Sequence, residues 1–268
     1  ILSGLVGSEM CIRDRPNTLV VLAALAAVTE RIGLAGTLNA TFNEPYNLAR
    51  QLATLDHVSG GRSAWNVVTS PGAFTGENFR RGAYLPHEQR YERAREFVEL
   101  ARHLWDGGDD GHGAFDYQGA QFNVRGRLDV PPLPQGHPII IQAGDSSQGR
   151  EFAARSADAI FTRHGSLEQG QAFYADVKAR LSRYGRAEAD LKILPGVGFV
   201  LGDTPEDAAA RHAEVRRQQV SPQTAIVLLE QLWNRDLSGF DPDGPLPDFD
   251  PDVLSLIHIS EPTRPERI

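Results

Sequence analysis

Cysteine and methionine are almost absent from this sequence. The single cysteine, Cys11, excludes an internal disulfide, and no spacing of cysteine and histidine residues matches a zinc site. A chain without disulfides is suited to a reducing compartment. We therefore expect a cytoplasmic protein that holds no metal.

Long apolar runs and clusters of basic residues are lacking as well. No segment approaches the roughly 20 apolar residues of a membrane-spanning helix, and the apolar stretch 20–28 is short and is followed by Glu30 and Arg31. The 27 basic and 35 acidic residues give a net charge of −8, and the basic residues are dispersed. We therefore expect neither nucleic acid nor a membrane as a partner.

The two ends of the chain differ in pattern and composition from the sequence between them. Residues 1–15 (ILSGLVGSEMCIRDR) and 255–268 (SLIHISEPTRPERI) resemble translated sequencing-adapter tails, so we expect both to be artefactual. A genuine N-terminal arm and C-terminal tail are the alternative. The domain that we expect spans residues 16–254, a length typical of one large domain.

From Thr18 to Ser221, helix-like and strand-like segments alternate, which is typical of βα units around a parallel sheet. The pattern predicts helices over residues 18–31, 45–58, 87–105, 147–156, 167–184 and 205–219. It predicts strands over residues 32–41, 63–69, 138–143, 158–163 and 192–201. Thr18 and Thr204 are candidate N-caps, and Pro45 fits a first helical turn.

Three further segments differ from this alternation or stand out within it. Residues 107–137 are rich in Gly, Asp and Pro and have no apolar period, so we expect a loop-like excursion from the sheet. Residues 234–252 form a Pro-rich linker. The apolar run Ile139–Ile141 predicts a strand buried on both faces.

The segment 60–70 (GGRSAWNVVTS) has the pattern of a site. A Gly-Gly-Arg turn precedes a short strand around Val67 and Val68, and the strand is followed by polar residues. Barrel enzymes place their chemistry at the carboxyl ends of their strands. The alternative is a plain core strand in which Asn66 is hydrogen-bonded to a neighbouring backbone group.

The sequence around this strand resembles the bacterial-luciferase-like flavin monooxygenases, in particular the nitrilotriacetate and dibenzothiophene-sulfone monooxygenase branch. The resemblance covers roughly residues 18–250. The matching segments, in order, are LAAVTERIGL (25–34), NEPYNLAR (43–50), LDHVSGGR (55–62), WNVVTS (65–70), NF (78–79), HEQRY (87–91) and QAGDS (142–146).

The resemblance implies an α/β fold, a (β/α)8 TIM barrel of the luciferase-like type. Five predicted strands are too few to close eight, so we expect an incomplete barrel without the first two strands and without the last strand and its helices. The excursion 107–137 then falls between the fourth and fifth barrel strands.

Residues 144–149 (GDSSQG) follow the Ile-rich strand and open a helix, where backbone N–H groups and serine hydroxyls favour a phosphate. This suits the phosphate of flavin mononucleotide (FMN), with Ser146 as the candidate ligand. An ordinary helix cap is the alternative. His87 and Tyr91 lie four residues apart on one helix face, and the resemblance implies that both contact FMN. The alternative is a surface histidine, with Tyr91 packed on Phe97 or Leu100.

Two strand residues complete the candidate FMN site. The resemblance implies a contact between Thr37 and the flavin, and Thr41 is the alternative if the register differs. The amide of Asn66 offers a donor and an acceptor to the edge of the flavin ring. A further family residue from an early strand would fall in or before residues 1–15, where no residue is assigned.

The resemblance implies that a separate NAD(P)H:FMN oxidoreductase supplies reduced FMN (FMNH2), which reacts with O2 and a small-molecule substrate. Aminopolycarboxylates, organosulfur compounds and other xenobiotics are the candidate substrates, and Arg80, Arg81 or Arg163 could receive an acidic group. We assign no catalytic base. Asp56 and His57 are adjacent on a helix and cannot face each other, so we expect His57 to be structural and held by a neighbouring carboxylate.

Other functions stay open at this point. A deazaflavin-dependent reductase could use the same barrel, although the WNVVTS and NEPY segments argue against it. A non-catalytic flavin-binding relative, or a truncated chain that folds incompletely, is the alternative from a different class. The resemblance also raises a possible homodimer.

Overall fold

The computed structural model describes residues 16–70, 79, 85–107, 113–219, 221–233, 237–241 and 244. The chain divides into two compact units, residues 1–196 and residues 197–268. The two segments expected to be artefactual, residues 1–15 and 255–268, lie outside the described residues. Within the described residues, no helix combines the length and the apolar character needed to cross a membrane.

The first unit is built on a parallel sheet of five strands in the order β1-β2-β5-β6-β7. The strands are β1 (Leu34–Asn39), β2 (Ser63–Val68), β5 (Ile139–Gln142), β6 (Ala159–Thr162) and β7 (Lys192–Pro195). Each lies within a strand expected from the sequence, and the parallel arrangement confirms the βα alternation. The carboxyl ends of all five strands therefore meet at one edge of the sheet.

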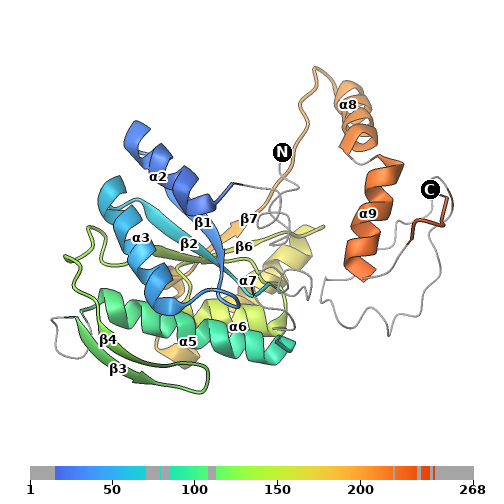
Figure 1. Cartoon of the computed structure of the whole chain (residues 1–268). Helices are drawn as coiled ribbons and strands as arrows, with labels where there is room; N and C mark the ends of the chain where they lie inside the picture. Colours follow the sequence, from blue (N-terminus) through green and yellow to red (C-terminus); the bar gives the residue numbers. More distant parts are fainter. Residues whose placement is uncertain are drawn as a thin grey trace. The chain divides into compact units, whose positions relative to one another are not determined.

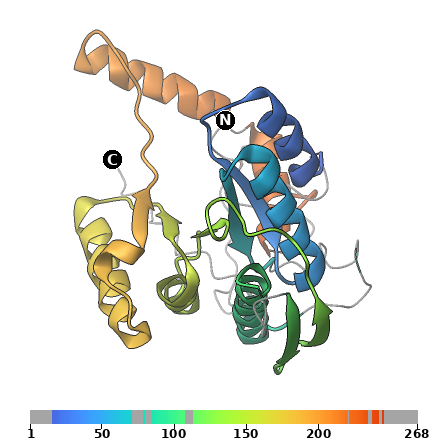
Figure 2. The same ribbon diagram turned by 90° about the vertical axis from the view of Figure 1, so that its left-hand side faces the viewer.

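Helices line the outer side of this sheet (Figures 1 and 2). They are α2 (Thr18–Val28), α3 (Pro45–Ser59), α5 (His87–Trp105), α6 (Ser147–Ser156) and α7 (Leu167–Leu181), followed by two short 3₁₀ turns (Ser182–Tyr184 and Glu188–Asp190). Pro45 opens α3 as expected. The expected N-cap of α2 is wrong by one residue, because Asn17, not Thr18, accepts the hydrogen bond from the Val20 amide.

The core lies between the sheet and these helices. Trp65 of β2 is fully buried and packs its ring against Phe97 of α5, with centroids 5.3 Å apart. Ile140 and Ile160 of the neighbouring strands are buried on the same side. The expectation that Ile139–Ile141 is buried on both faces is wrong, because Ile139 is 40% exposed while Ile140 is buried.

An antiparallel hairpin occupies part of the expected loop 107–137. Its strands are β3 (Ala114–Gln118) and β4 (Asn123–Arg127). The carboxylate of Glu96 on α5 accepts hydrogen bonds from the turn amides of Ala120 (3.0 Å) and Gln121 (2.9 Å). This buried anion fixes the hairpin to α5.

The second unit contains helices α8 (Pro205–Gln219) and α9 (Pro222–Trp233). The hydroxyl of Thr204 accepts a hydrogen bond from the Asp207 amide, which confirms the cap expected before α8. Helix α9 was not expected. The expected strand 192–201 is too long, because β7 ends at Pro195.

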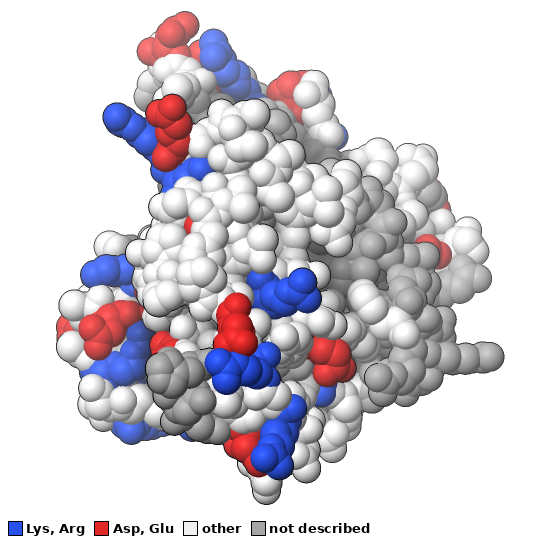
Figure 3. All heavy atoms as spheres, turned by 60° about the vertical axis from the view of Figure 1, so that its left-hand side comes forward, with Lys and Arg blue, Asp and Glu red and all other residues white. Residues whose placement is uncertain are grey.

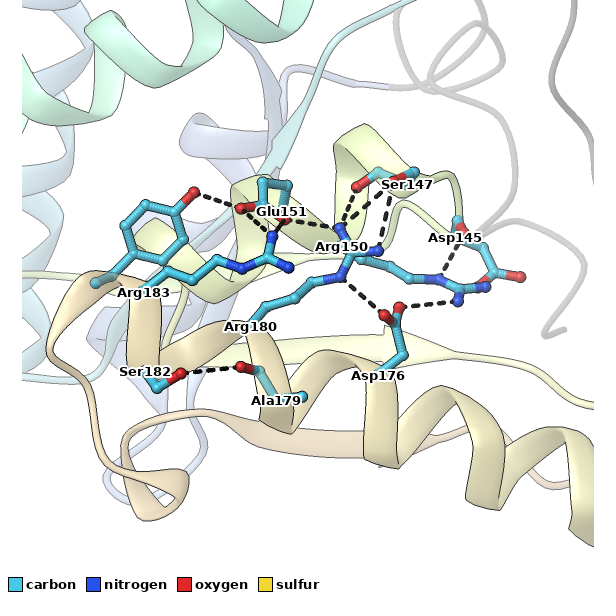
Figure 4. Close-up of polar contacts among 10 residues, drawn as sticks. Asp145, Ser147, Arg150, Glu151, Asp176, Ala179, Arg180, Ser182 and Arg183 are labelled. Atoms are coloured by element: carbon cyan, nitrogen blue, oxygen red, sulfur yellow. Dashed lines mark hydrogen bonds and ion pairs between the residues drawn. The ribbon is translucent and has the colours of Figure 1, made fainter.

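A network of three arginines and three carboxylates joins α6 to α7 (Figure 4). Arg180 donates to Glu151 (2.7 Å) and Asp176 (3.1 Å), and it also reaches the backbone oxygen of Ser147 at the first turn of α6 (3.1 Å). Arg150 links Asp145 to Asp176, and Arg183 adds a second contact to Glu151. The network therefore fixes the N-terminal turn of α6.

The charges of this network shift the pKa values of its carboxylates. A hydrogen bond from Tyr184 lowers the pKa of Glu151, burial raises it, and Arg180 and Arg183 lower it further, so the net shift is downward. Burial raises the pKa of Asp176, but the hydrogen bonds from Arg180 and Arg150 outweigh it. Both carboxylates are therefore stabilised in their charged form.

At the opposite edge of the sheet, Arg62 binds backbone oxygens of two helix ends. Its guanidinium donates to Ser59 at the end of α3 (2.7 Å), and to Ala26 (3.2 Å) and Thr29 (2.7 Å) at the end of α2. It also donates to the Ile32 oxygen (2.8 Å). The planar group thus satisfies carbonyls that a helix leaves without a partner.

Replacing Arg62 by lysine should lower the free energy of unfolding by about 1–3 kcal/mol, because an ammonium cannot reach all these carbonyls and some stay unsatisfied. Urea denaturation followed by circular dichroism measures the change. Arg50→Lys, an exposed position on α3, is the matched control and should change stability little. Equal effects of the two substitutions would contradict the role of Arg62.

Replacing Glu151 by glutamine should lower stability at neutral pH by about 1 kcal/mol, since partly exposed ion pairs are screened. Because the pKa of Glu151 is lowered in the folded state, its contribution is present above its ordinary pKa and disappears as the pH falls through the lowered value. The difference between wild type and Glu151→Gln should therefore vanish in acid. Unfolding curves from pH 2 to 8, with the exposed Glu30→Gln as control, test this; a difference independent of pH would contradict it.

Candidate functional site

Buried polar residues gather at the carboxyl edge of the sheet. They follow or end four neighbouring strands and are Asn39, Thr41, Ser70, Gln142 and Thr162. Buried polar groups need hydrogen-bond partners, and most of these bind the loop that follows their own or the next strand. The Asn39 side-chain oxygen accepts from the Phe42 amide (2.7 Å), and the Thr41 hydroxyl donates to the Thr69 oxygen (3.0 Å). This edge is therefore tightly organised.

Thr37 and Asn66 lie opposite each other in the register of β1 and β2. The Asn66 amide nitrogen donates to the Thr37 hydroxyl at 3.1 Å. The side-chain oxygen of Asn66 is buried and has no partner in the part of the chain that the structure describes. The structure thus brings two predicted site residues together, and among the described residues Asn66 binds the Thr37 side chain, not the neighbouring backbone group of the alternative.

Ser146 begins α6 as its N-cap, and its hydroxyl oxygen accepts a hydrogen bond from the Gly149 amide at 3.1 Å. This is the cap geometry that the sequence left as an alternative. It remains compatible with phosphate binding, because a hydroxyl that accepts one hydrogen bond can still donate its proton to an anion. The first-turn amides of the helix point to the same side.

Tyr91 of α5 lies next to this loop. A Cβ atom placed on Gly144 would come within 2.9 Å of the Tyr91 hydroxyl oxygen and 3.0 Å of the Gln142 amide nitrogen, so a side chain there would displace one of these two groups. The Tyr91 ring contacts Phe152 of α6, with centroids 6.3 Å apart. Tyr91 therefore faces the loop 144–149 as well as the core.

The remaining predicted residues are placed only in part. His87 begins α5, but its side chain lies outside the described part of the structure, so its pairing with Tyr91 stays a prediction. Arg80 and Arg81 also lie outside the described residues, and Arg163 is exposed just after β6. Thr41 binds Thr69, which leaves Thr37 as the partner of Asn66.

Asp56 and His57 do not form a pair. The Asp56 carboxylate accepts from the Ser63 hydroxyl (2.7 Å) at the amino end of β2, away from the candidate site. The His57 ring lies 3.1 Å from the Pro131 oxygen. The expectation that a carboxylate holds His57 is wrong. Among the described residues, no group of three His, Cys, Asp or Glu is arranged to hold a metal ion.

Two arginines of α5 were missed by the sequence reasoning. Arg90 donates to the Thr69 oxygen (3.2 Å), and Arg93 donates to the Ala40 oxygen (3.1 Å) and the Asn43 oxygen (3.2 Å). They hold Thr69, just after β2, and the backbone of residues 40–43 after β1. Their spacing of three residues on one helix face, beside Tyr91, was the available signal.

Comparison with known proteins agrees with this geometry. The chain is 44% identical over 255 residues to nitrilotriacetate monooxygenase component A of Aminobacter aminovorans, covering 89% of this chain and 56% of that protein. It is 39% identical over 260 residues to the dibenzothiophene-sulfone monooxygenase of Rhodococcus erythropolis, covering 89% and 57%. The chain therefore spans about half the length of the curated relatives it matches.

Among solved structures, a riboflavin lyase with modified FMN and riboflavin superposes with a TM-score of 0.76 at 30% identity, covering 88% of this chain and 57% of that one. A coenzyme F420-dependent reductase from Methanopyrus kandleri reaches a TM-score of 0.60 at 16% identity, which shows the fold alone. These neighbours support the expected luciferase-like TIM barrel, which is open in the described residues.

Residues 6–242 match the family of luciferase-like monooxygenases over most of the chain. The strand motif at Asn66, the loop at Ser146 and the helix at Tyr91 are the same segments that carried the resemblance in the sequence. The chain belongs to the luciferase-like monooxygenase family.

Proposed function

We propose that this protein is the oxygenase component of a two-component flavin monooxygenase. In this function, reduced FMN and O2 oxidise a small organic substrate. The observation that carries the proposal is the unsatisfied side-chain oxygen of Asn66, whose amide nitrogen donates to the Thr37 hydroxyl on the same sheet edge as the loop 144–149. A buried acceptor without a partner fits a ligand with N–H groups, such as reduced flavin.

The residues at this edge fit FMN. Ser146 and the first turn of α6 would bind the phosphate, and Tyr91 would close the loop 144–149 from the side of α5. Arg150 neutralises Asp145 beside this turn at 3.1 Å, which keeps a carboxylate from repelling the phosphate. Asn66 and Thr37 would bind the ring edge.

When bound, reduced FMN would supply two electrons and two protons, so that one oxygen atom of O2 enters the substrate, the other leaves as water, and oxidised FMN remains. The protein positions the flavin, excludes bulk water and admits the substrate. The hydrogen bonds from Thr41 and Arg90 to the Thr69 oxygen would fix the backbone just after β2 beside the ring site. None of the described residues is assigned as a catalytic base.

A separate NAD(P)H:FMN oxidoreductase would supply the reduced flavin. The nitrilotriacetate relative is named component A, which supports a system of more than one protein. The relatives support only a broad class of substrate: an aminopolycarboxylate, an organosulfur compound or another xenobiotic. The cytoplasmic location stays a prediction.

A homodimer is part of the proposal. Helix α2 carries apolar residues on every side and exposes Val20, Val21, Leu25 and Val28. The face drawn in Figure 3 has a broad area without charged side chains. A helix that is apolar all round is normally buried. In the proposed homodimer, the second copy of the chain would bury the exposed face of α2.

The deazaflavin alternative has less support, because the F420-dependent neighbour shares only 16% identity whereas the monooxygenase relatives share 39–44%. A non-catalytic flavin-binding protein would bind FMN without oxidising a substrate. A chain that folds incompletely would bind none. Flavin binding and substrate turnover therefore separate these functions.

Anaerobic titration with FMN, reduced FMN and riboflavin tests the proposed site. Reduced FMN should bind more tightly than oxidised FMN, and FMN more tightly than riboflavin. Ser146→Ala should remove most of the preference for FMN over riboflavin, a loss of about tenfold, because the phosphate loses a charge-assisted hydrogen bond.

Ser166→Ala is the matched control. Ser166 caps α7 with the same geometry, its hydroxyl oxygen accepting from the Gln169 amide at 3.3 Å. Its substitution should lower stability as Ser146→Ala does while leaving the FMN preference unchanged. If a folded wild-type protein bound neither flavin, or if both variants behaved alike, the proposed site would be wrong.

A further inference from the structure

Ser70 has an uncommon backbone conformation. It follows β2 with a φ of 22°, and it is the one non-glycine residue with positive φ among the described residues. Residues other than glycine rarely adopt a positive φ, because it strains the backbone. Such backbone strain is found mostly where function requires it. Ser70 is also only 1% exposed.

Neighbouring residues keep this conformation in place. The carbonyl oxygen of Thr69 accepts hydrogen bonds from the Thr41 hydroxyl (3.0 Å) and from Arg90 (3.2 Å). One donor comes from the segment after β1 and the other from α5. The peptide between Thr69 and Ser70 is thus held from two sides, which sets the direction of the Ser70 side chain.

The Ser70 hydroxyl is buried and has no hydrogen-bond partner in the described part of the chain. A serine hydroxyl can rotate to find a nearby acceptor, so its lack of one is unusual. The side-chain oxygen of Asn66, four residues earlier on the same strand segment, is also unsatisfied. Two unsatisfied polar atoms therefore belong to β2 and its immediate continuation.

The position of Ser70 connects both parts of the candidate site. Asn66 precedes it on β2, and Arg90, which binds its neighbour Thr69, is adjacent in sequence to Tyr91 at the loop 144–149. We propose that Ser70 is a further flavin-contacting residue whose hydroxyl donates a hydrogen bond to bound FMN. This inference rests on the proposed function.

Binding of FMN to Ser70→Ala and Ser70→Gly tests the inference, with dissociation constants from flavin fluorescence and unfolding curves without flavin. Both variants should bind FMN about 5–10-fold more weakly than wild type, the loss expected for one hydrogen bond. Without flavin, Ser70→Ala should be at least as stable as wild type, because an unsatisfied hydroxyl is removed. Ser70→Gly should be more stable still, because glycine tolerates positive φ.

Ser156→Ala is the matched control, a buried serine at the far end of α6. It should leave FMN affinity unchanged. FMN affinity of Ser70→Ala within twofold of wild type, together with a clear loss for Ser146→Ala, would overturn the inference and leave the proposed function intact. Lower stability of unliganded Ser70→Ala would overturn it too, since the hydroxyl would then serve the fold. Absence of FMN binding by folded wild type would overturn the proposed function and this inference together.

Discussion

The orientation of the candidate site depends on the burial of one side chain, Trp65. Its indole nitrogen donates to the Leu38 oxygen of β1 (2.9 Å), and its ring packs on Phe97 of α5. Side chains alternate along a strand, so burying Trp65 and Val67 against the helices turns Asn66 to the other face. A shift of one residue would bury Asn66 in the core and expose Trp65. The core therefore determines which face of the sheet can bind a ligand.

The two edges of the sheet are stabilised by charged side chains that bind backbone groups. At the carboxyl edge, three residues spaced by three on α5 do this: Arg90 and Arg93 bind carbonyls after β2 and β1, and Glu96 binds amides of the hairpin turn. At the amino edge, Arg62 binds the ends of α2 and α3, and Arg186 binds the Ala154 oxygen (2.8 Å) and the Ala157 oxygen (2.7 Å) near the end of α6. Such contacts satisfy loops and helix ends that local structure leaves open. The backbone immediately after β1 and β2 is thereby held from α5.

Local patterns in the sequence predicted the five strands and the helices of the first unit, because each has a clear period and clear end signals. The expected helix 45–58 and the observed α3 (Pro45–Ser59) differ by one residue. The hairpin of β3 and β4 could not be predicted in this way, because Glu96 holds its turn from 24 residues away. The strand expected over residues 192–201 was too long for a different reason. Val197, Phe199 and Leu201 have the alternating apolar pattern of a strand, but all three are exposed. An alternating pattern does not by itself supply a neighbouring strand to pair with.

Sequence motifs predicted individual residues of the candidate site. Among them, Thr37 and Asn66 form the pair that the structure brings together. No motif could show that the Asn66 oxygen and the Ser70 hydroxyl lack partners, because that depends on every group packed around them. An acceptor on β2 and a donor just after it, both left unsatisfied, lower the stability of the unliganded protein. A ligand that supplies both partners removes this cost and binds only the folded state, so its binding stabilises the fold. The polar atoms that lower the stability of the protein without flavin are thus the ones that would make flavin binding selective.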